Sequence, residues 1–117
     1  MSGKSNMQFR LSLNGENIDL PQIEEALHIR LNGGCIDAPK ELPTNRDCPI
    51  FYEQIAWLID LAEKNRETLI GSGVDLSRSQ IWLNYAYCKQ CNMEFDAALL
   101  ERMGKHGSKL CISCEEV

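Results

Sequence analysis

The stretch of sequence that decides the expected fold lies near the C-terminus and reads Cys88-Lys89-Gln90-Cys91 and, after nineteen intervening residues, Cys111-Ile112-Ser113-Cys114. Two residues between cysteines allow a tight turn to direct both sulfurs at one point, and two such turns supply the tetrahedron that zinc prefers. Because all four ligands are thiolates, no position stays open for water, and the predicted site is structural rather than catalytic. We therefore expect one zinc ion, bound by Cys88, Cys91, Cys111 and Cys114.

Length and composition set the limits for the rest of the chain. The 117 residues, 44% of them hydrophobic and 25% charged, suffice for one compact domain or for a small domain with a metal-bound appendage. No run approaches the ~20 apolar residues of a membrane span, and residues 1–8 lack a secretory signal. We expect a cytoplasmic protein, in which reduced thiols favour metal binding. Three disulfides in a secreted chain are the alternative interpretation of the six cysteines.

The charge distribution bears on the partner. A formal net charge of −5 gives no general attraction to nucleic acid, because phosphate binding requires lysine and arginine. The exception is the stretch 102–109, which has three basic residues and no acidic one. His106, in this stretch, is expected on an exposed turn between Gly104 and Gly107. The candidates for contact with nucleic acid or with a protein partner are Arg102, Lys105 and Lys109.

Hydrophobic periodicity predicts the elements of the N-terminal part. Residues 7–13 alternate apolar and polar side chains, as in a half-buried strand, and Asn14-Gly15 favours a tight turn. A short return strand from Asn17 completes the expected hairpin. Asp19 is a candidate N-cap for a helix that runs to about Leu31.

The remainder is predicted to be a loop followed by helices. Residues 35–49 contain three prolines and form the expected loop at a domain boundary. Residues 50–70 place apolar side chains three and four positions apart, which predicts a helix that ends at Gly71-Ser72-Gly73. The period of residues 75–87 is ambiguous, but the short glycine turn before them favours a second, antiparallel helix. A short helix over 97–103 is expected inside the zinc finger.

These elements define the expected architecture, an α+β fold that is mainly α. It consists of a short N-terminal β-hairpin, two or three helices that include a helical hairpin, and a C-terminal four-cysteine zinc finger. The strand and helix unit, the proline-rich loop, the helical hairpin and the zinc finger are expected at residues 1–34, 35–49, 50–86 and 87–117.

Residues 87–116 carry a more specific pattern. An aromatic residue, Tyr87, precedes the first cysteine pair, and Phe95 follows Cys91 by four positions. A short apolar helix and the sequence Leu110-Cys111-Ile112-Ser113-Cys114 complete the segment. In these residues the chain resembles the C-terminal zinc finger of the DksA/TraR family, whose bacterial, phage and plasmid members bind RNA polymerase. The resemblance implies that the four cysteines bind zinc and that RNA polymerase is the partner.

The expected function follows from the finger and from the acidic charge. We expect a small zinc-finger regulatory protein of bacterial or phage origin that binds a protein machine such as RNA polymerase and modulates transcription. Two alternatives stay open: a phage-type inhibitor or adaptor that blocks a host enzyme, and a DNA-binding zinc-finger protein. No Ser/His/Asp or Cys/His arrangement is recognisable around the two histidines, so neither an enzyme nor a membrane partner is expected.

Overall fold

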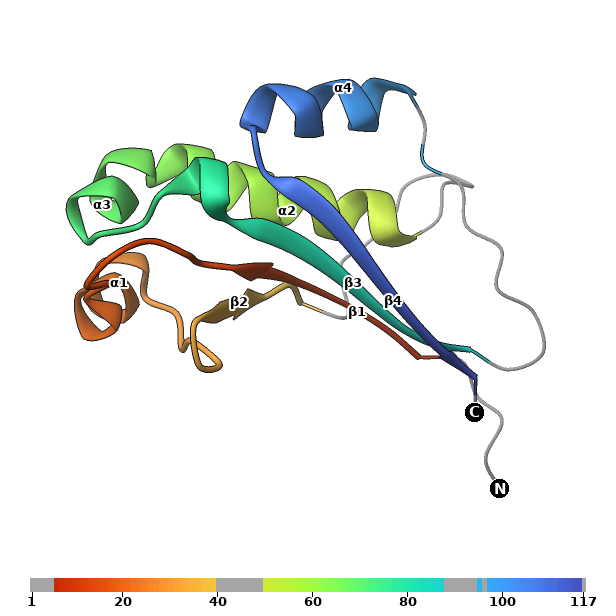
Figure 1. Ribbon diagram of the computed structural model, residues 1–117, viewed down its shortest axis with the longest axis horizontal. Coiled ribbons are helices and arrows are strands. Elements are labelled where there is room, and N and C mark those ends of the chain that lie inside the picture. Colours follow the sequence, from red (N-terminus) through yellow and green to blue (C-terminus); the bar gives the residue numbers. More distant parts are fainter. Residues whose placement is uncertain (1–5, 40–49, 88–94, 96, 117) are drawn as a thin grey trace.

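The structure, a computed structural model, describes residues 6–39, 50–87, 95 and 97–116, and these contain a four-stranded mixed β-sheet (Figure 1). β1 (Asn6–Ser12) is antiparallel to both of its neighbours, whereas β4 (Lys109–Glu116) runs parallel to β3 (Gln80–Tyr87). The pairing of β1 with β3 therefore joins the N-terminal part of the chain to its C-terminal half. In the spatial order of the sheet, the strands are β2 (Cys35–Asp37), β1 (Asn6–Ser12), β3 (Gln80–Tyr87) and β4 (Lys109–Glu116).

Two helices lie on one side of this sheet. α2 (Ile50–Lys64) runs along it, and α4 (Ala97–His106) belongs to the crossover that the parallel strands β3 and β4 require (Figure 1). α1 (Leu20–Leu27), α3 (Arg66–Gly71) and the 3-10 turn η1 (Leu76–Arg78) gather at the end of the sheet where β1 ends and β3 begins. Among these described helices, none has both the length and the apolar character needed to cross a membrane.

The hydrophobic core lies between the sheet and α2, with a contribution from α4. Alternate side chains of the central strands β1 and β3 point toward these helices and are fully buried. Removing this apolar surface from water is the main favourable contribution to folding. The core side chains that are at most 1% exposed include Phe9, Leu11, Ile55, Leu58, Ile59, Ile81, Leu83 and Leu99.

The prediction of a mainly α fold is wrong, because a four-stranded sheet forms the framework of the molecule. The decisive difference concerns residues 80–87, expected in the second helix of the hairpin, which form the central strand β3. Its backbone pairs with β1 and β4, which are distant in sequence, and local periodicity does not report such partners. Ile81 and Leu83 are buried while Trp82 between them is half-buried, which is the period of two that a strand requires.

The predicted N-terminal hairpin is also incorrect. β1 is present, but residues 13–19 contain no return strand: Asn17 has a positive φ of 51°, and Gly15 forms an isolated bridge with Val74. The antiparallel outer neighbour of β1 is β2, which comes from the segment expected as a loop. Each of the four expected segments thus contributes residues to one sheet.

The other predicted helices are present with shifted ends. α1 begins as expected, since the Asp19 carboxylate accepts a hydrogen bond from the Gln22 amide at 3.2 Å. It ends at Leu27, earlier than predicted, because His28 adopts the left-handed conformation with a φ of 57°. α2 and α3 together cover the helix predicted over 50–70.

Two loops cross at the end of the sheet and touch through their backbones. The Glu16 amide donates a hydrogen bond to the Gly73 carbonyl at 3.1 Å, and the Asp75 amide donates one to the Asn14 carbonyl at 2.8 Å. Gly15 lies at the crossing, where a Cβ atom would overlap the carbonyl oxygen of Gly73. A side chain at position 15 therefore requires the two loops to separate.

Asp75 also caps the turn η1. Its Oδ1 accepts hydrogen bonds from the Ser77 hydroxyl at 2.6 Å and from the Ser77 amide at 3.0 Å. The hydroxyl hydrogen bond is the main cause that lowers the pKa of the Asp75 carboxyl below its usual value of 3.8, and the positive charge of Arg78 acts in the same direction. The cap therefore stabilises this loop at neutral pH and loses strength as the carboxyl is protonated in acid.

Gly15→Ala is expected to lower the free energy of unfolding by about 1–3 kcal/mol, because the added methyl group forces the crossing loops apart. Gly104→Ala in α4 is the matched control, since a Cβ there meets no atom within 4 Å. Alanine favours the helix, so this control is expected to gain about 0.5–1 kcal/mol. Urea denaturation followed by circular dichroism measures both changes. Unchanged stability of Gly15→Ala would contradict the close crossing.

Candidate functional site

The face of the sheet opposite α2 and α4 carries mainly polar side chains. Strand pairing places Arg10 opposite Trp82 and Gln8 opposite Asn84. Each of these four residues is half-buried, whereas the residues between them on the helix side are buried. We call this surface the open face, and we define it by Gln8, Arg10, Gln80, Trp82, Asn84, Ala86, Lys109, Cys111, Ser113 and Glu115, none of which is buried.

Two interactions order the centre of the open face. Arg10 Nε lies 3.1 Å from Asp37 Oδ1, which joins β1 to β2. The indole Nε1 of Trp82 donates a hydrogen bond to Gln80 Oε1 at 3.0 Å along the strand. With its polar atom satisfied, the half-buried Trp82 keeps part of its ring accessible in the middle of the face. Tryptophan and arginine are the residue types enriched at the energetic centres of protein interfaces.

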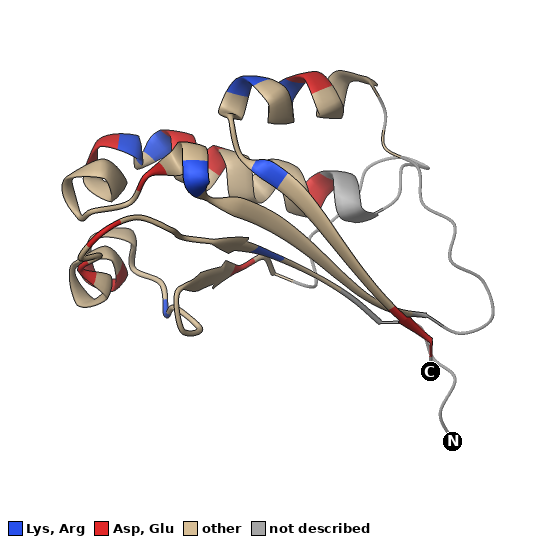
Figure 2. Ribbon diagram, viewed as in Figure 1, with Lys and Arg blue, Asp and Glu red and all other residues tan. Residues whose placement is uncertain are grey.

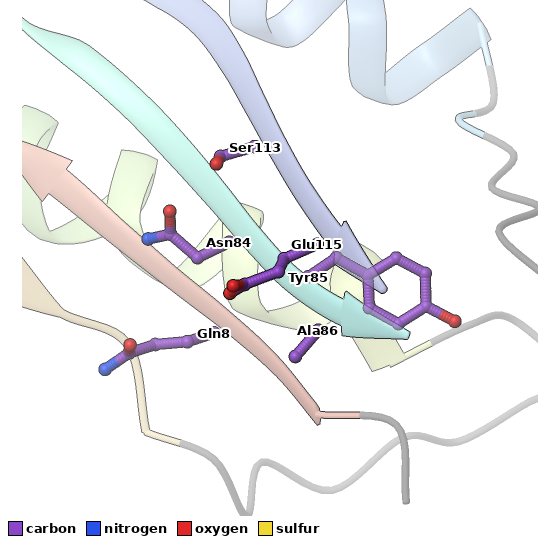
Figure 3. Close-up of a pocket in the computed structure, with 6 residues that line it drawn as sticks. All are labelled: Gln8, Asn84, Tyr85, Ala86, Ser113 and Glu115. Atoms are coloured by element: carbon purple, nitrogen blue, oxygen red, sulfur yellow. The ribbon is translucent and has the colours of Figure 1, made fainter. Parts of the chain in front are cut away.

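An open hollow of about 160 Å³ lies toward the end of this face (Figure 3). The amides of Gln8 and Asn84 both donate and accept hydrogen bonds, the Ser113 hydroxyl does the same, and the Glu115 carboxylate accepts. The described side chains that line the hollow thus offer amide, hydroxyl and carboxylate groups, which suit the recognition of polar groups. Its lining residues are Gln8, Asn84, Tyr85, Ala86, Ser113 and Glu115.

The three basic residues singled out in the sequence lie on two elements, α4 and β4. Arg102 on α4 forms an ion pair with Asp60 on α2, and Lys105 lies 3.8 Å from Glu101 within α4. Lys109 is exposed at the start of β4. Two of the three positive charges are therefore engaged by acidic side chains of the same molecule. Arg102 in particular helps to hold α4 against α2.

His106 is buried rather than exposed on a turn, because α4 continues through Gly104 and ends after His106, at Gly107 with a φ of 93°. Its side chain is 1% exposed, and Nδ1 lies 2.6 Å from Oε2 of Glu63 on α2. Glu63 Oε2 also lies 3.6 Å from Arg66 Nη1. The histidine therefore links α4 to α2 on the side of the sheet opposite the open face.

The cysteines of the predicted zinc site are only partly described. Cys88 and Cys91 lie outside the described residues, whereas Cys111 and Cys114 belong to β4. Because side chains alternate along a strand, residues three positions apart point to opposite faces of the sheet. Cys111 belongs to the open face, and Cys114 belongs to the other face, where it is exposed.

This arrangement of Cys111 and Cys114 does not fit a shared zinc ion. Both sulfurs must lie about 2.3 Å from the metal, which a strand does not permit for residues on opposite faces. Within the described residues, no group of three or more histidine, cysteine, aspartate or glutamate side chains is placed to hold a metal. Zinc binding stays a prediction from the motif, and it requires residues 111–114 to leave the strand and form a turn.

No protein family, curated protein or solved structure matches this chain. The DksA/TraR resemblance of residues 87–116 therefore rests on the residue pattern of that segment.

The open face is the feature that sequence-based prediction missed. A signal for it exists in residues 80–85, where Ile81, Leu83 and Tyr85 alternate with the more polar Gln80, Trp82 and Asn84. Interpreting residues 75–87 as a helix concealed this alternation, because a helix repeats every 3.6 residues whereas a strand repeats every two.

Zinc binding and strand β4 are expected to exclude each other. Zinc added to the reduced, metal-free chain is expected to bind at one ion per chain and to accelerate amide exchange in residues 109–116, because the turn and the strand need different backbone conformations. Cys111→Ser should lose the metal and keep the protected strand, whereas Cys35→Ser should keep the metal. Metal analysis and hydrogen-exchange mass spectrometry measure these effects. Zinc bound without any change in exchange contradicts the geometry, and a chain that binds no zinc overturns the zinc prediction.

Glu63→Gln is expected to lower the free energy of unfolding by about 1–2 kcal/mol, because a charged acceptor facing the buried His106 is replaced by a neutral group. The matched control is Glu67→Gln, the same change at an exposed position of α3, for which we expect a change within about 0.5 kcal/mol. Thermal and urea unfolding at neutral pH compare the two variants. Equal effects of both changes would show that the His106–Glu63 contact contributes nothing.

Proposed function

We propose that this protein is a non-enzymatic regulatory protein that binds a larger protein assembly through the open face of its sheet. The observation that carries this proposal is the open face itself. A half-buried tryptophan and an arginine lie among amide and hydroxyl side chains, on a sheet whose other face holds the core. A rigid surface with an aromatic centre and polar surroundings has the anatomy of a protein-binding site.

The charges favour a protein partner over nucleic acid. The formal net charge is −5, and Arg10 on the open face is paired with Asp37. Sheets that bind single-stranded nucleic acid combine several stacking aromatic residues with a basic groove. The open face, as defined above, has one tryptophan and two basic residues, Arg10 and Lys109, and its hollow contains the acidic Glu115.

RNA polymerase is the assembly that the resemblance of residues 87–116 implies, and it is the partner that we propose to test first. Modulation of transcription, in a bacterial or phage setting, is then the consequence of binding. On the support of the motif alone, the four cysteines would hold a structural zinc ion, and in that form the open face would consist of its β1 and β3 residues, because residues 111–114 leave the strand. The alternative function, inhibition of another host enzyme, would use the same open face with a different partner.

Purified bacterial RNA polymerase is expected to be retained by the immobilised 117-residue chain. Asn84→Arg is expected to weaken retention at least about tenfold, or about 1.4 kcal/mol, because it places a long charged side chain in the hollow of the open face. Gln22→Arg makes the same amide-to-arginine change at an exposed position of α1 and should bind like the parent chain. Circular dichroism establishes that both variants are folded.

Three results would count against the proposal. If the Asn84→Arg and Gln22→Arg variants retain equal amounts of RNA polymerase, the open face is not part of the interface. A parent chain that retains no RNA polymerase removes that assembly as the partner. Binding of a DNA fragment that persists at moderate salt supports the DNA-binding alternative instead, since binding driven by phosphate contacts alone weakens steeply with salt.

A further inference from the structure

Strand β4 forms an outer edge of the sheet in the part of the chain that the structure describes. In the order β2-β1-β3-β4 it pairs with β3 on one side, and no other described strand lies on its outer side. Residues 112–116 are exposed, and Ile112 has 43% of its surface accessible. Proteins usually protect such edges with proline, bulges or charges, but residues 110–114 contain neither proline nor a charged side chain. This edge is therefore suited to pairing with another strand.

We infer that the outer edge of β4 pairs with β4 of a second copy of this chain, so that the four strands of each copy join in one continuous sheet. The charges at the ends of the strand decide its direction. β4 begins with Lys109 and ends with Glu115 and Glu116, which Figure 2 shows as a basic start and an acidic end. A parallel pair would place like charges side by side, whereas an antiparallel pair brings the basic start of one copy to the acidic end of the other.

Symmetry then restricts the register. The two-fold axis of an antiparallel pair stands perpendicular to the sheet and keeps each face on its own side, so residue 112 can oppose residue 112 but not residue 113. With Ile112 opposite Ile112 of the second copy, Lys109 lies opposite Glu115 at both ends of the pair. Moving the centre to Cys111 or to Ser113 removes both charge pairs. The register centred on Ile112 is the one that the sequence of β4 favours.

The same register gives the contact an uncharged centre. The exposed Ile112 side chains of the two copies meet at the axis, and Leu110 lies opposite Cys114 of the second copy. An apolar centre with a charged rim is the usual anatomy of a protein interface. Because the axis keeps the faces of the sheet apart, the two open faces lie on the same side of the joined sheet. This inference rests on the β4 edge and does not depend on the proposed function.

The test is the mass of the full chain in solution, with reductant to prevent disulfides and a chelator to keep residues 109–116 in the strand. Sedimentation equilibrium over a micromolar concentration series is expected to show a dimer of 26.6 kDa, twice the 13.3 kDa of one chain. Lys109→Glu and Glu115→Lys should each weaken the dimer at least about tenfold, because each converts two attractive pairs into two like-charge pairs. Lys105→Glu on α4 makes the same change of charge away from β4 and should leave the dimer unchanged.

Mixing the two β4 variants gives the most specific result. Positions 109 and 115 are six residues apart in one strand, about 20 Å, which exceeds the Debye length of about 8 Å at physiological salt, so the charges do not compensate within a chain. Between the two variants, however, both opposed positions again carry opposite charges, and we expect the mixture to dimerise like the parent chain.

Several outcomes overturn the inference. A monomer at every concentration excludes the dimer. A dimer that survives both single variants uses another surface. A mixture of the variants that stays monomeric excludes the proposed register. Ile112→Lys, at an exposed position, provides a second probe, since it places like charges at the axis and should also yield folded monomers by circular dichroism.

Discussion

The structure depends on the pairing of β3 with a strand on each of its edges. Once β1 and β4 hold it, alternate side chains must point to opposite sides of the sheet. Ile81 and Leu83 lie on the helix side and complete the core, and Trp82 between them therefore lies on the opposite face. The core and the open face are therefore two results of one backbone constraint, and the position of the tryptophan is fixed by the residues that stabilise the fold.

The sequence predicted the elements that are determined locally. The alternation in residues 7–13 identified β1, the Asp19 cap identified the start of α1, and the apolar face of residues 50–70 identified the long helix. β2 escaped detection because its three residues are too few to show a period. β3 was assigned to a helix although it alternates, because its partners lie far away in the sequence.

The candidate site was harder to predict because the same residues satisfy two patterns. Residues 110–114 match a zinc motif by their cysteines and a strand by the alternation of Leu110 and Ile112. Only the neighbouring strand distinguishes the two interpretations, and a neighbour is not visible in a local pattern. Likewise, the local sequence around Arg102 does not show its ion pair with Asp60, because Asp60 is contributed by a different helix.

The parallel pairing of β3 and β4 has a consequence for the folding of the chain during its synthesis. β4 follows every other described strand in the chain, so it leaves the ribosome after β1, β2 and β3. Until then, β3 exposes one backbone edge, although in the finished sheet it is the strand with a neighbour on both sides. Closing that edge requires a distant contact across α4, and such contacts form slowly. The nascent chain therefore passes through a state in which its most central strand is its most vulnerable one to misassociation.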